Sequence, residues 1–292
     1  MARAMVGIIG GTGLGEALGA LAGGEVREVP TPFGAPSGPI TLGEVAGVPV
    51  ALLSRHGEGH LLNPSAVPYR ANIWALKSLG VTHILASGAV GSLREEVAPR
   101  NLVIPDQVID RTFRRAGTFF DDLAVHVELA APFCTTLRNV LVKAGTGSPT
   151  RIHQGGTYVC MEGPQFSTRA ESELHRSWGA SLIGMTAMPE AKLAREAEIC
   201  YALVALPTDY DCWKPHPASL DQAKVIEEIL ANVKAATQNA LELIRRAIPQ
   251  VAAIEKACPC QSALALAIWS DRSRISATAR QRLAPILAKY LG

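Results

Sequence analysis

The stretch GMTAMPEAKLAREAEICYALVALPTDYD, residues 184–211, decides the fold class of this 292-residue chain. An apolar run over residues 180–185 precedes a segment of good helix formers, 189–197, and a second apolar run follows over 199–206. Short apolar runs on either side of a helix predict a strand–helix–strand unit whose strands are both buried. Asp209 and Asp211 come directly after the second strand, where α/β sheets usually bind ligands. An Asp-rich turn or helix cap is the alternative interpretation.

The composition indicates a globular protein without an electrostatic preference for polyanions. Hydrophobic residues make up 48% of the chain and charged residues 18%, and the net charge is +2. We therefore expect no nucleic-acid partner and no membrane partner. No apolar run reaches the roughly 18 residues of a spanning helix. The first 24 residues imitate a signal peptide only faintly, because glycines and Glu16 interrupt their apolar centre. We expect a cytoplasmic protein.

Two further strand exits carry groups that suit an anion. The predicted strand 6–9 runs into Gly10-Gly11-Thr12-Gly13, which matches neither the dinucleotide pattern nor a P-loop. Its backbone amides and the Thr12 hydroxyl are suited to an anion, although a simple tight turn is an equal alternative. A predicted hairpin, 40–45 and 48–53, ends in Ser54-Arg55-His56-Gly57. The Arg55 guanidinium suits phosphate or carboxylate, and an ordinary surface arginine is the alternative.

Small residues and an aromatic residue follow two more predicted strands. The strand 82–87 is followed by Gly88 and Ala89, which let a ligand approach the main chain closely. The strand 157–161 leads into a polar turn that contains Phe166. An exposed aromatic side chain is costly unless it stacks on a partner, and burial in the core is the alternative.

The remaining pattern predicts a single α/β domain over residues 1–250 with a helical C-terminal extension, 251–292. Residues 68–79 predict a helix, and 101–109 extend the sheet. Ser219 and Gln222 form a capping box that opens a long amphipathic helix reaching Pro249. Residues 262–269 and 277–291 predict two more helices, packed on the domain or on a neighbouring subunit.

Six cysteines are present: Cys134, Cys160, Cys200, Cys212, Cys258 and Cys260. The Cα atoms of Cys258 and Cys260 lie about 5.5–7 Å apart in any conformation of Cys-Pro-Cys, within reach of a disulfide. Two thiols alone do not make a zinc site, and no Cys/His pair at finger spacing accompanies them. We expect the other four cysteines to be buried free thiols.

An anion site, a flat platform and a carboxylate pair together suggest attack on a nucleoside by phosphate. Cleavage of the N-glycosidic bond requires that the departing base be neutralised. A buried Asp whose pKa is raised can protonate a purine nitrogen. Such general acid catalysis contributes roughly two to four powers of ten. Orientation of phosphate and ribose would supply the rest of the rate enhancement.

The sequence closely resembles the 5′-methylthioadenosine phosphorylases of the purine nucleoside phosphorylase superfamily. The resemblance covers residues 6–250, and its blocks fall in the family's order: GIIGGTGL (7–14), TPFGAPS (31–37), RHG (55–57), NP (63–64), YRANIWALK (69–77), GSLREE (91–96), PDQVIDRT (105–112), EGPQFSTRAE (162–171), MTAMPEAKLAREAEICYA (185–202) and TDYDCW (208–213). It implies a mixed central sheet flanked by helices. It also implies phosphorolysis of 5′-methylthioadenosine to adenine and 5-methylthioribose 1-phosphate, in purine and methionine salvage. The family uses no metal and no organic cofactor; phosphate is a substrate.

The resemblance also implies a role for individual residues. The phosphate ligands are Thr12, Arg55, His56 and Thr186, with the backbone of Gly88 and Ala89. Met185 would line the ribose. The purine would be bound by Phe166, Ser167, Asp209 and Asp211, of which Asp209 faces N7 and Asp211 reads the 6-amino group; these two are the catalytic pair. The pocket for the 5′-methylthio group would include Leu220, Ala223 and, from a neighbouring subunit, His126.

Gly184 and Gly88 differ from the residues common in the family, and Asp209 indicates that the substrate base is adenine. Relatives that act on oxo-purines carry Asn at the position of Asp209, and Asp favours adenine over hypoxanthine. Gly184 stands where many members have Asn. Gly88 stands where others have Thr, so we expect the affinity for phosphate to differ.

Members of the family form trimers or hexamers, and the same is expected here. The Cys258-Pro259-Cys260 motif resembles the Cys-x-Cys of archaeal hexameric members, in which it is associated with disulfides and thermostability. The resemblance therefore predicts a thermophilic enzyme with a Cys258–Cys260 disulfide.

Three alternatives stay open. The nearest is a broader purine nucleoside phosphorylase or a methylthioinosine enzyme. A hydrolytic nucleosidase would turn over without phosphate, and Arg55 and His56 argue against it. A purine-binding protein without catalysis would retain Asp209 but turn over no nucleoside.

Overall fold

The computed structural model describes residues 5–11, 24–215, 221–256 and 258–291. Their strands form one mixed sheet with the order β2-β3-β4-β1-β5-β10-β9-β7, and β11, β6 and β8 continue from β5. The strands are β1 (Met5–Gly10), β2 (Glu25–Arg27), β3 (Ile40–Val45), β4 (Val48–Ser54), β5 (Val81–Ser92), β6 (Leu102–Ile104), β7 (Gln107–Arg111), β8 (Ile152–Gln154), β9 (Thr157–Met161), β10 (Leu182–Gly184) and β11 (Cys200–Asp209). The expected mixed sheet and the hairpin are confirmed.

Strand β5 is the centre of this sheet. It runs parallel to β1 and to β11, and its last residues pair with β10 in the antiparallel direction. The expectation that this strand ends at Ser87 is wrong, because β5 continues to Ser92. Gly88 and Ala89 pair with Ala205 and Leu206, so they belong to a strand and not to a loop.

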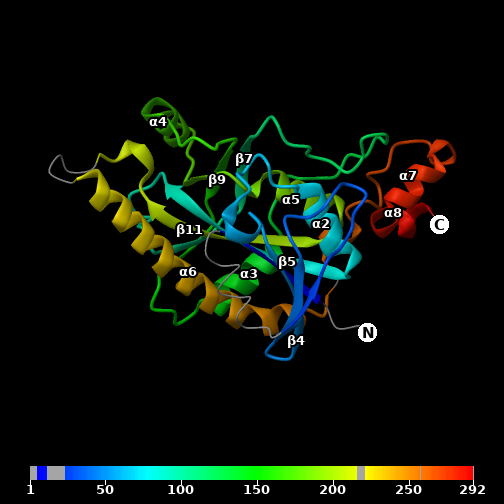
Figure 1. The fold of residues 1–292 in the computed structure, drawn as a ribbon, viewed down its shortest axis with the longest axis horizontal. Helices are drawn as coiled ribbons and strands as arrows, with labels where there is room; N and C mark the ends of the chain where they lie inside the picture. Colours follow the sequence, from blue (N-terminus) through cyan, green and yellow to red (C-terminus); the bar gives the residue numbers. More distant parts are fainter. Residues whose placement is uncertain (1–4, 12–23, 216–220, 257, 292) are drawn as a thin grey trace.

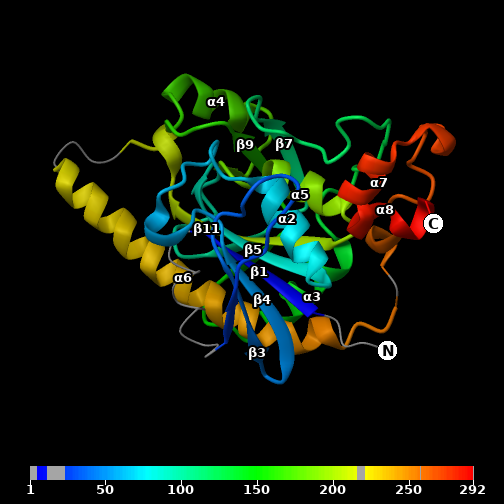
Figure 2. The same ribbon diagram turned by 45° about the vertical axis from the view of Figure 1, so that its right-hand side comes forward.

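Helices cover both faces of the sheet (Figures 1 and 2). On one face, α6 and α3 pack against apolar side chains of β1, β5 and β11; on the other face lie α2, α5 and α8. The helices are α2 (Tyr69–Ser78), α3 (Thr135–Ala144), α4 (Arg169–Ser177), α5 (Ala187–Glu196), α6 (Gln222–Ala252), α7 (Ala277–Arg282) and α8 (Ala284–Leu291), with short 3₁₀ helices η1 (Glu58–His60), η2 (Asp211–Trp213), η3 (Pro259–Ser262) and η4 (Arg272–Arg274). None of the helices in the described ranges is long and apolar enough to cross a membrane.

The predicted strand–helix–strand unit is present as β10–α5–β11. Its two strands are buried almost throughout, as their apolar runs predicted. They do not pair with each other, because each pairs with β5. Helix α5 therefore carries the chain from one side of β5 to the other, and β11 delivers Asp209 at its C-terminal end.

The long helix differs at both ends from the prediction. The side chain of Asp221 caps it by accepting from the Ala223 amide, whereas Ser219 lies outside the described residues. The helix also continues three residues beyond Pro249. The helix predicted over 262–269 is wrong: η3 ends at Ser262, and turns follow it.

Residues 258–291 pack against the same chain. Leu264, Leu283 and Leu287 join the core beside α2, and the indole of Trp74 donates to the carbonyl of Arg282 at 3.3 Å. Glu198 accepts from the Leu264 amide at 3.0 Å. The boundary placed at residue 250 stays a prediction.

The hydroxyl of Tyr158 explains why glycine occupies position 184, where the family often has Asn. A Cβ at Gly184 would overlap with this hydroxyl, and the ring carbon that carries it would be only 2.7 Å away. Tyr158 is itself fully buried in β9. The phenol therefore fills the space that a side chain at 184 would need.

Gly184→Ala should lower the free energy of unfolding by about 1–3 kcal/mol, because the buried phenol cannot move away without disturbing the core. Gly38→Ala is the matched control, since no atom lies within 4 Å of the position that its Cβ would take, and a change within about 0.5 kcal/mol is expected there. Urea denaturation of the two variants measures the difference. Equal stabilities would contradict the steric argument.

Candidate active site

Asp209 and Asp211 lie together at the C-terminal exit of β11. One carboxylate oxygen of Asp209 accepts from the Thr208 hydroxyl at 2.7 Å, and the other accepts from the Asp211 amide at 2.9 Å. Asp211 has a left-handed backbone conformation, with φ of 50°. Its Oδ2 is buried and makes no hydrogen bond within the described residues. A buried carboxylate oxygen without a partner is costly, and a ligand that donates to it would remove that cost.

Helix α6 holds the end of β11 through a residue that no sequence motif indicated. The side-chain amide of Asn232 donates to the Thr208 carbonyl at 2.9 Å and accepts from Arg100 at 2.7 Å. Asn232 is 4% exposed. A polar residue on the buried stripe of an amphipathic helix was the available signal.

A cavity of about 320 Å³ opens at this exit, between the end of β11 and the first turns of α6. Asp209 and Asp211 line its polar side. Val225 and Ile229, both half-buried, contribute apolar side chains from α6. A cavity of this size, mostly apolar with a few convergent polar groups, is typical of a small-molecule site.

Phe166 and Ser167 lie in the turn after β9, near the same exit. The thiol of Cys212 donates to the Ser167 carbonyl at 3.3 Å, which joins this turn to the residue after Asp211. Phe166 is 85% exposed, so the alternative in which it is buried in the core is wrong. An exposed aromatic ring in this turn is available for stacking on a flat ligand.

Arg55 forms a buried ion pair and is not a surface arginine. Its exposure is 0%, and its Nε and Nη2 donate to the two oxygens of Glu190 at 2.7 Å each. Nη1 donates to the Ser87 carbonyl at 2.6 Å. Three of its five N–H groups are thus engaged with the protein itself.

The ends of β1 and β4, the interior of β5 and the start of α5 meet around this ion pair. A Cβ on Gly11 would lie 2.7 Å from the Ser87 carbonyl and 3.1 Å from Arg55 Nη1, and a Cβ on Gly88 would lie 3.4 Å from the Thr186 hydroxyl. Gly11 also donates its amide to the Ser87 hydroxyl at 3.2 Å. Backbone groups and hydroxyls therefore converge as an anion site requires. Thr12 lies outside the described residues.

His56 lies beside Arg55 and is held as a neutral imidazole. Burial, and then the positive charge of Arg55, lower the pKa of His56 to about 4. Its Nδ1 donates to the Leu62 carbonyl at 2.8 Å, since a carbonyl can only accept. Its ring stacks on that of His60, with centroids 4.2 Å apart. Nε2 is then the nitrogen with which His56 can contact a ligand.

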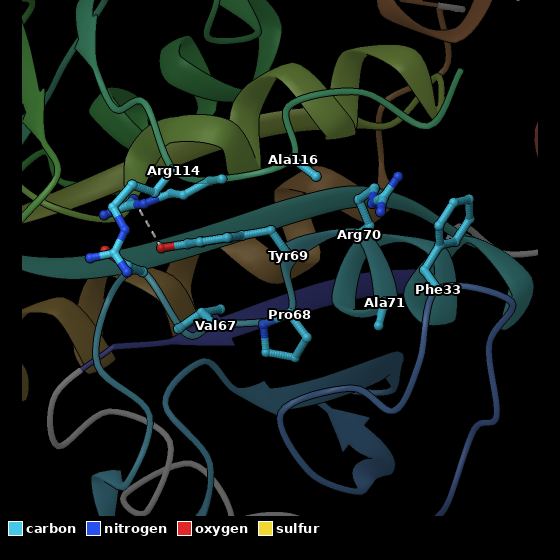
Figure 3. A pocket seen from close by; sticks show the side chains of 10 residues that line it. Phe33, Val67, Pro68, Tyr69, Arg70, Ala71, Arg114 and Ala116 are labelled. Carbon is cyan, nitrogen blue, oxygen red and sulfur yellow. Dashed lines mark hydrogen bonds between the residues drawn. The ribbon is translucent and has the colours of Figure 1, made fainter. Parts of the chain in front are cut away.

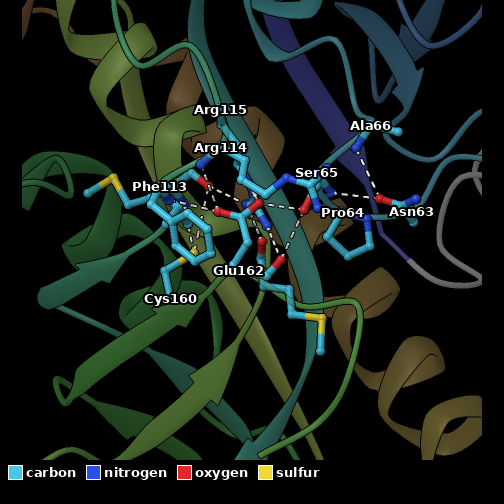
Figure 4. A network of polar contacts seen from close by, with 12 residues as sticks. Asn63, Pro64, Ser65, Ala66, Phe113, Arg114, Arg115, Cys160 and Glu162 are labelled. Carbon is cyan, nitrogen blue, oxygen red and sulfur yellow. Dashed lines mark hydrogen bonds and ion pairs between the residues drawn. The ribbon is translucent and has the colours of Figure 1, made fainter.

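Glu162, Arg115 and Ser65 form a network of polar contacts (Figure 4). Burial alone would raise the pKa of Glu162, but the hydrogen bonds from Ser65 and from the amides of residues 113 and 114, together with the charge of Arg115, lower it to about 2. Arg115 donates to the Met185 carbonyl at 2.5 Å and to the Met188 carbonyl at 2.7 Å. The network therefore fixes the main chain at the predicted ribose position; no sequence motif pointed to Arg115.

A smaller cavity of about 200 Å³, which Arg115 also lines, lies at the start of α2 (Figure 3). Tyr69 forms one wall and accepts from Arg115 at 3.2 Å through its hydroxyl. The guanidinium of Arg70 lies 5.0 Å from the centroid of the Phe33 ring. This cavity contains none of the predicted site residues.

The residues predicted for the 5′ pocket stay a prediction. Leu220 lies outside the described residues, and Ala223 is exposed and does not line the larger cavity. Val225 and Ile229 are the apolar residues by which α6 lines that cavity. His126 packs on Trp269 of its own chain, with ring centroids 4.6 Å apart.

The predicted Cys258–Cys260 disulfide is not formed, since all six cysteines, each of which the structure describes, are free. Cys134, Cys160 and Cys200 are buried as expected, and Cys212 is half-buried. The thermophile expectation depended on that disulfide and loses its support.

Comparisons with known proteins agree in one family. Residues 5–249 match the family model of the phosphorylase superfamily. An S-methyl-5′-thioadenosine phosphorylase of Geobacter sulfurreducens is 49% identical over 98% of this chain and 99% of its own length. A crystal structure of a methylthioadenosine phosphorylase from an Antarctic soil metagenomic library has a TM-score of 0.89 and 46% identity, with coverage of 98% of this chain and 100% of that one.

A structure of a mutant adenosine/methylthioadenosine phosphorylase from Schistosoma mansoni, in complex with methylthioadenosine, is also similar. Its TM-score is 0.80 and its identity 34%, and the match covers 98% of both chains.

Glu162→Gln should lower the free energy of unfolding by about 3 kcal/mol at pH 7, because it removes a charge from a nearly buried ion pair. The folded-state pKa lies below the unfolded value of 4.5, so this stability is present above pH 4.5 and is lost as the pH falls toward 2. The difference between the wild type and the variant should therefore shrink as the pH is lowered from 6 to 3 in urea titrations. Glu173→Gln, which alters an exposed pair with Arg176, is the control; a difference for Glu162→Gln that is constant with pH would contradict the assignment.

Proposed function

The chain belongs to the phosphorylase superfamily and, within it, to the S-methyl-5′-thioadenosine phosphorylases, and on that premise we propose that it converts 5′-methylthioadenosine and inorganic phosphate into adenine and 5-methylthioribose 1-phosphate. The enzyme is a pentosyltransferase of purine and methionine salvage. The observation that carries the proposal is the carboxylate pair at the exit of β11, in which Asp211 Oδ2 is buried and has no partner among the residues described. That oxygen needs a donor, and the 6-amino group of adenine is one.

In this mechanism, phosphate binds in the cradle formed by Thr186 and the strand residues Gly88 and Ala89, with Thr12 as a further ligand. Arg55 supplies positive charge from beneath the cradle, while Glu190 compensates for that charge in the free enzyme. A neutral His56 accepts a hydrogen bond from a protonated phosphate oxygen through Nε2. These groups hold a phosphate oxygen in line with C1′ of the ribose.

On the purine side, Phe166 and Ser167 hold the base, and Asp209 faces N7. A bond forms between phosphate oxygen and C1′ while the bond from C1′ to N9 breaks, and its electron pair moves into the purine. Asp209 donates a proton to N7, so adenine leaves as a neutral molecule. Asp211 accepts from the 6-amino group, which selects adenine over hypoxanthine.

The sugar is bound between these two halves by the main chain at Met185, which Arg115 holds in place. The 5′-methylthio group occupies the apolar part of the cavity beside Val225 and Ile229. A 5′-hydroxyl group would lose its hydration there, so the methylthio substrate is favoured. Leu220, Ala223 and a neighbouring subunit's copy of His126 complete this pocket in the oligomer, a trimer or hexamer. No cofactor takes part.

Asp209→Asn should reduce adenine release about 10²–10⁴-fold, because an amide cannot supply the proton to N7. The measurement is adenine release from methylthioadenosine with phosphate present and absent. Asp271→Asn, an exposed cap of η4, is the matched control and should keep wild-type activity. Release without phosphate would make the enzyme a nucleosidase, and turnover of inosine but not of methylthioadenosine would contradict the role of the carboxylate pair.

Thr186→Val should raise the KM for phosphate roughly tenfold to hundredfold, because a hydrogen bond to a charged ligand is worth about 1.5–3 kcal/mol. The KM for methylthioadenosine should stay within about twofold, since the hydroxyl contacts phosphate only. Thr237→Val is the control: this threonine is also buried but lies on α6. An equal rise in both KM values for Thr186→Val would indicate a general distortion and would reject the phosphate contact.

A further inference from the structure

Four of the six cysteines meet in one buried place, away from the active site. Cys134 is the N-cap of α3, Cys200 begins β11, and Cys258 and Cys260 flank Pro259 at the start of η3. Their sulfur atoms all lie within 4.8 Å of one another, and all four residues are buried. We call these four residues the cysteine cluster. It is the only group of this kind found among the described residues.

The spacing of the sulfur atoms fits a metal ion better than it fits disulfides. Cys134 Sγ and Cys258 Sγ are 3.5 Å apart, whereas a disulfide needs about 2.05 Å. A tetrahedral zinc ion with Zn–S bonds of about 2.3 Å places its ligand atoms about 3.8 Å from one another. The cluster needs only a small contraction of its wider pairs to reach that geometry. Four sulfurs this close together leave space for a single ion and not for an iron–sulfur cluster.

A helix terminus and a hydroxyl group lie beside the sulfur atoms of the cysteine cluster. The N-terminus of the ten-residue helix α3 points its dipole at Cys134, and such a position stabilises a thiolate. The hydroxyl of Thr136 donates to Cys258 Sγ at 3.9 Å. These groups offset part of the negative charge that four thiolates would carry.

The backbone holds the ligands in register. The Cys134 amide donates to the Tyr201 carbonyl at 2.8 Å, so the start of α3 is fixed against the residue after Cys200. The Gln261 amide donates to the Cys258 carbonyl at 2.9 Å and forms the turn that brings Cys258 and Cys260 to the same side. Metal sites of this preorganised kind are structural, because all four positions belong to the protein.

We propose that the cysteine cluster is a structural zinc site, with one Zn²⁺ ion bound by four thiolates. Binding forms four Zn–S bonds and releases the four thiol protons to solvent, so no oxidant or reductant takes part. The ion fastens residues 258–260 to β11 and α3. The proposal goes beyond the proposed function: Cys200 and Asp209 stand at opposite ends of β11, about 30 Å apart. It also differs from the expectation of no metal, which the family resemblance implied.

The first experiment is the metal content of the untagged full-length protein, purified without chelator and measured by inductively coupled plasma mass spectrometry. About one zinc per chain is expected, with sulfur neighbours at about 2.3 Å in X-ray absorption at the zinc edge. The X-ray absorption measurement uses the wild type, so its result does not depend on whether a variant folds. Nitrogen or oxygen neighbours in place of sulfur would overturn the proposal.

Variants then test the assignment to these residues. The double variant Cys258→Ser, Cys260→Ser should lose the zinc, and Cys212→Ser, a cysteine outside the cluster, should keep it. Zinc retained in the double variant would overturn the proposal, because the metal would then bind elsewhere. Iron in place of zinc would also overturn it in its stated form.

Counting the reactive thiols distinguishes a zinc site from free thiols and from disulfides. Alkylation of the wild type in denaturant without reductant should label six thiols only after a chelator has removed the zinc. Six reactive thiols with no metal would overturn the proposal in favour of free thiols, and two or four unreactive sulfurs after chelation would overturn it in favour of disulfides. Removal of zinc should lower the melting temperature of the protein. The dependence of the reaction on phosphate and the ratio of methylthioadenosine to inosine turnover should stay unchanged. These activity measurements test the proposed function separately, so failure of one proposal can be distinguished from failure of the other.

Discussion

The buried ion pair between Arg55 and Glu190 is the interaction on which the phosphate half of the site depends. Neither side chain is exposed by more than 1%, and two parallel hydrogen bonds join them. The Tyr201 hydroxyl donates to Glu190 as well, and Arg55 reaches the Ser87 carbonyl. One interaction therefore connects β4, β5, α5 and β11. Loss of either partner would leave a buried charge, at a cost of about 3–5 kcal/mol, so the cradle and the core are stable only together.

The two ends of β11 have different roles: one end forms part of the active site, and the other end binds the C-terminal residues. Its C-terminal end presents Asp209 to the larger cavity, and its N-terminal end contributes Cys200 to the cysteine cluster. Just before the strand, Glu198 accepts from the Tyr290 hydroxyl at 2.5 Å and so holds the chain's last helix. The C-terminal residues can therefore stabilise the strand without entering the site that its other end forms.

The pKa values of two buried carboxyl groups are shifted in opposite directions, because their hydrogen-bond donors and neighbouring charges differ. Burial raises the pKa of Glu196 to about 7, because the amide of Phe119 and the hydroxyl of Thr118 compensate only in part. Donors around Glu162 outweigh burial and lower its pKa to about 2. Glu162 is thus a fixed charge that orders the ribose wall. A buried oxygen of Asp211 lacks a donor within the described residues, which is the feature of a site prepared for a ligand.

The sequence by itself determined the strand–helix–strand unit, the hairpin and the long helix, because apolar periodicity and turn chemistry are local. It also located Asp209, Asp211 and Phe166 at strand exits, since the ends of parallel strands share one edge of a sheet. Only the tertiary structure decided that Arg55 is buried against Glu190, that Tyr158 requires Gly184, and that Asn232 and Arg115 support the site. It likewise brought Cys134 and Cys258, 124 residues apart, to a sulfur separation of 3.5 Å. Such contacts join segments distant in the chain, and no local pattern records which distant partners the packing of a sheet will bring together.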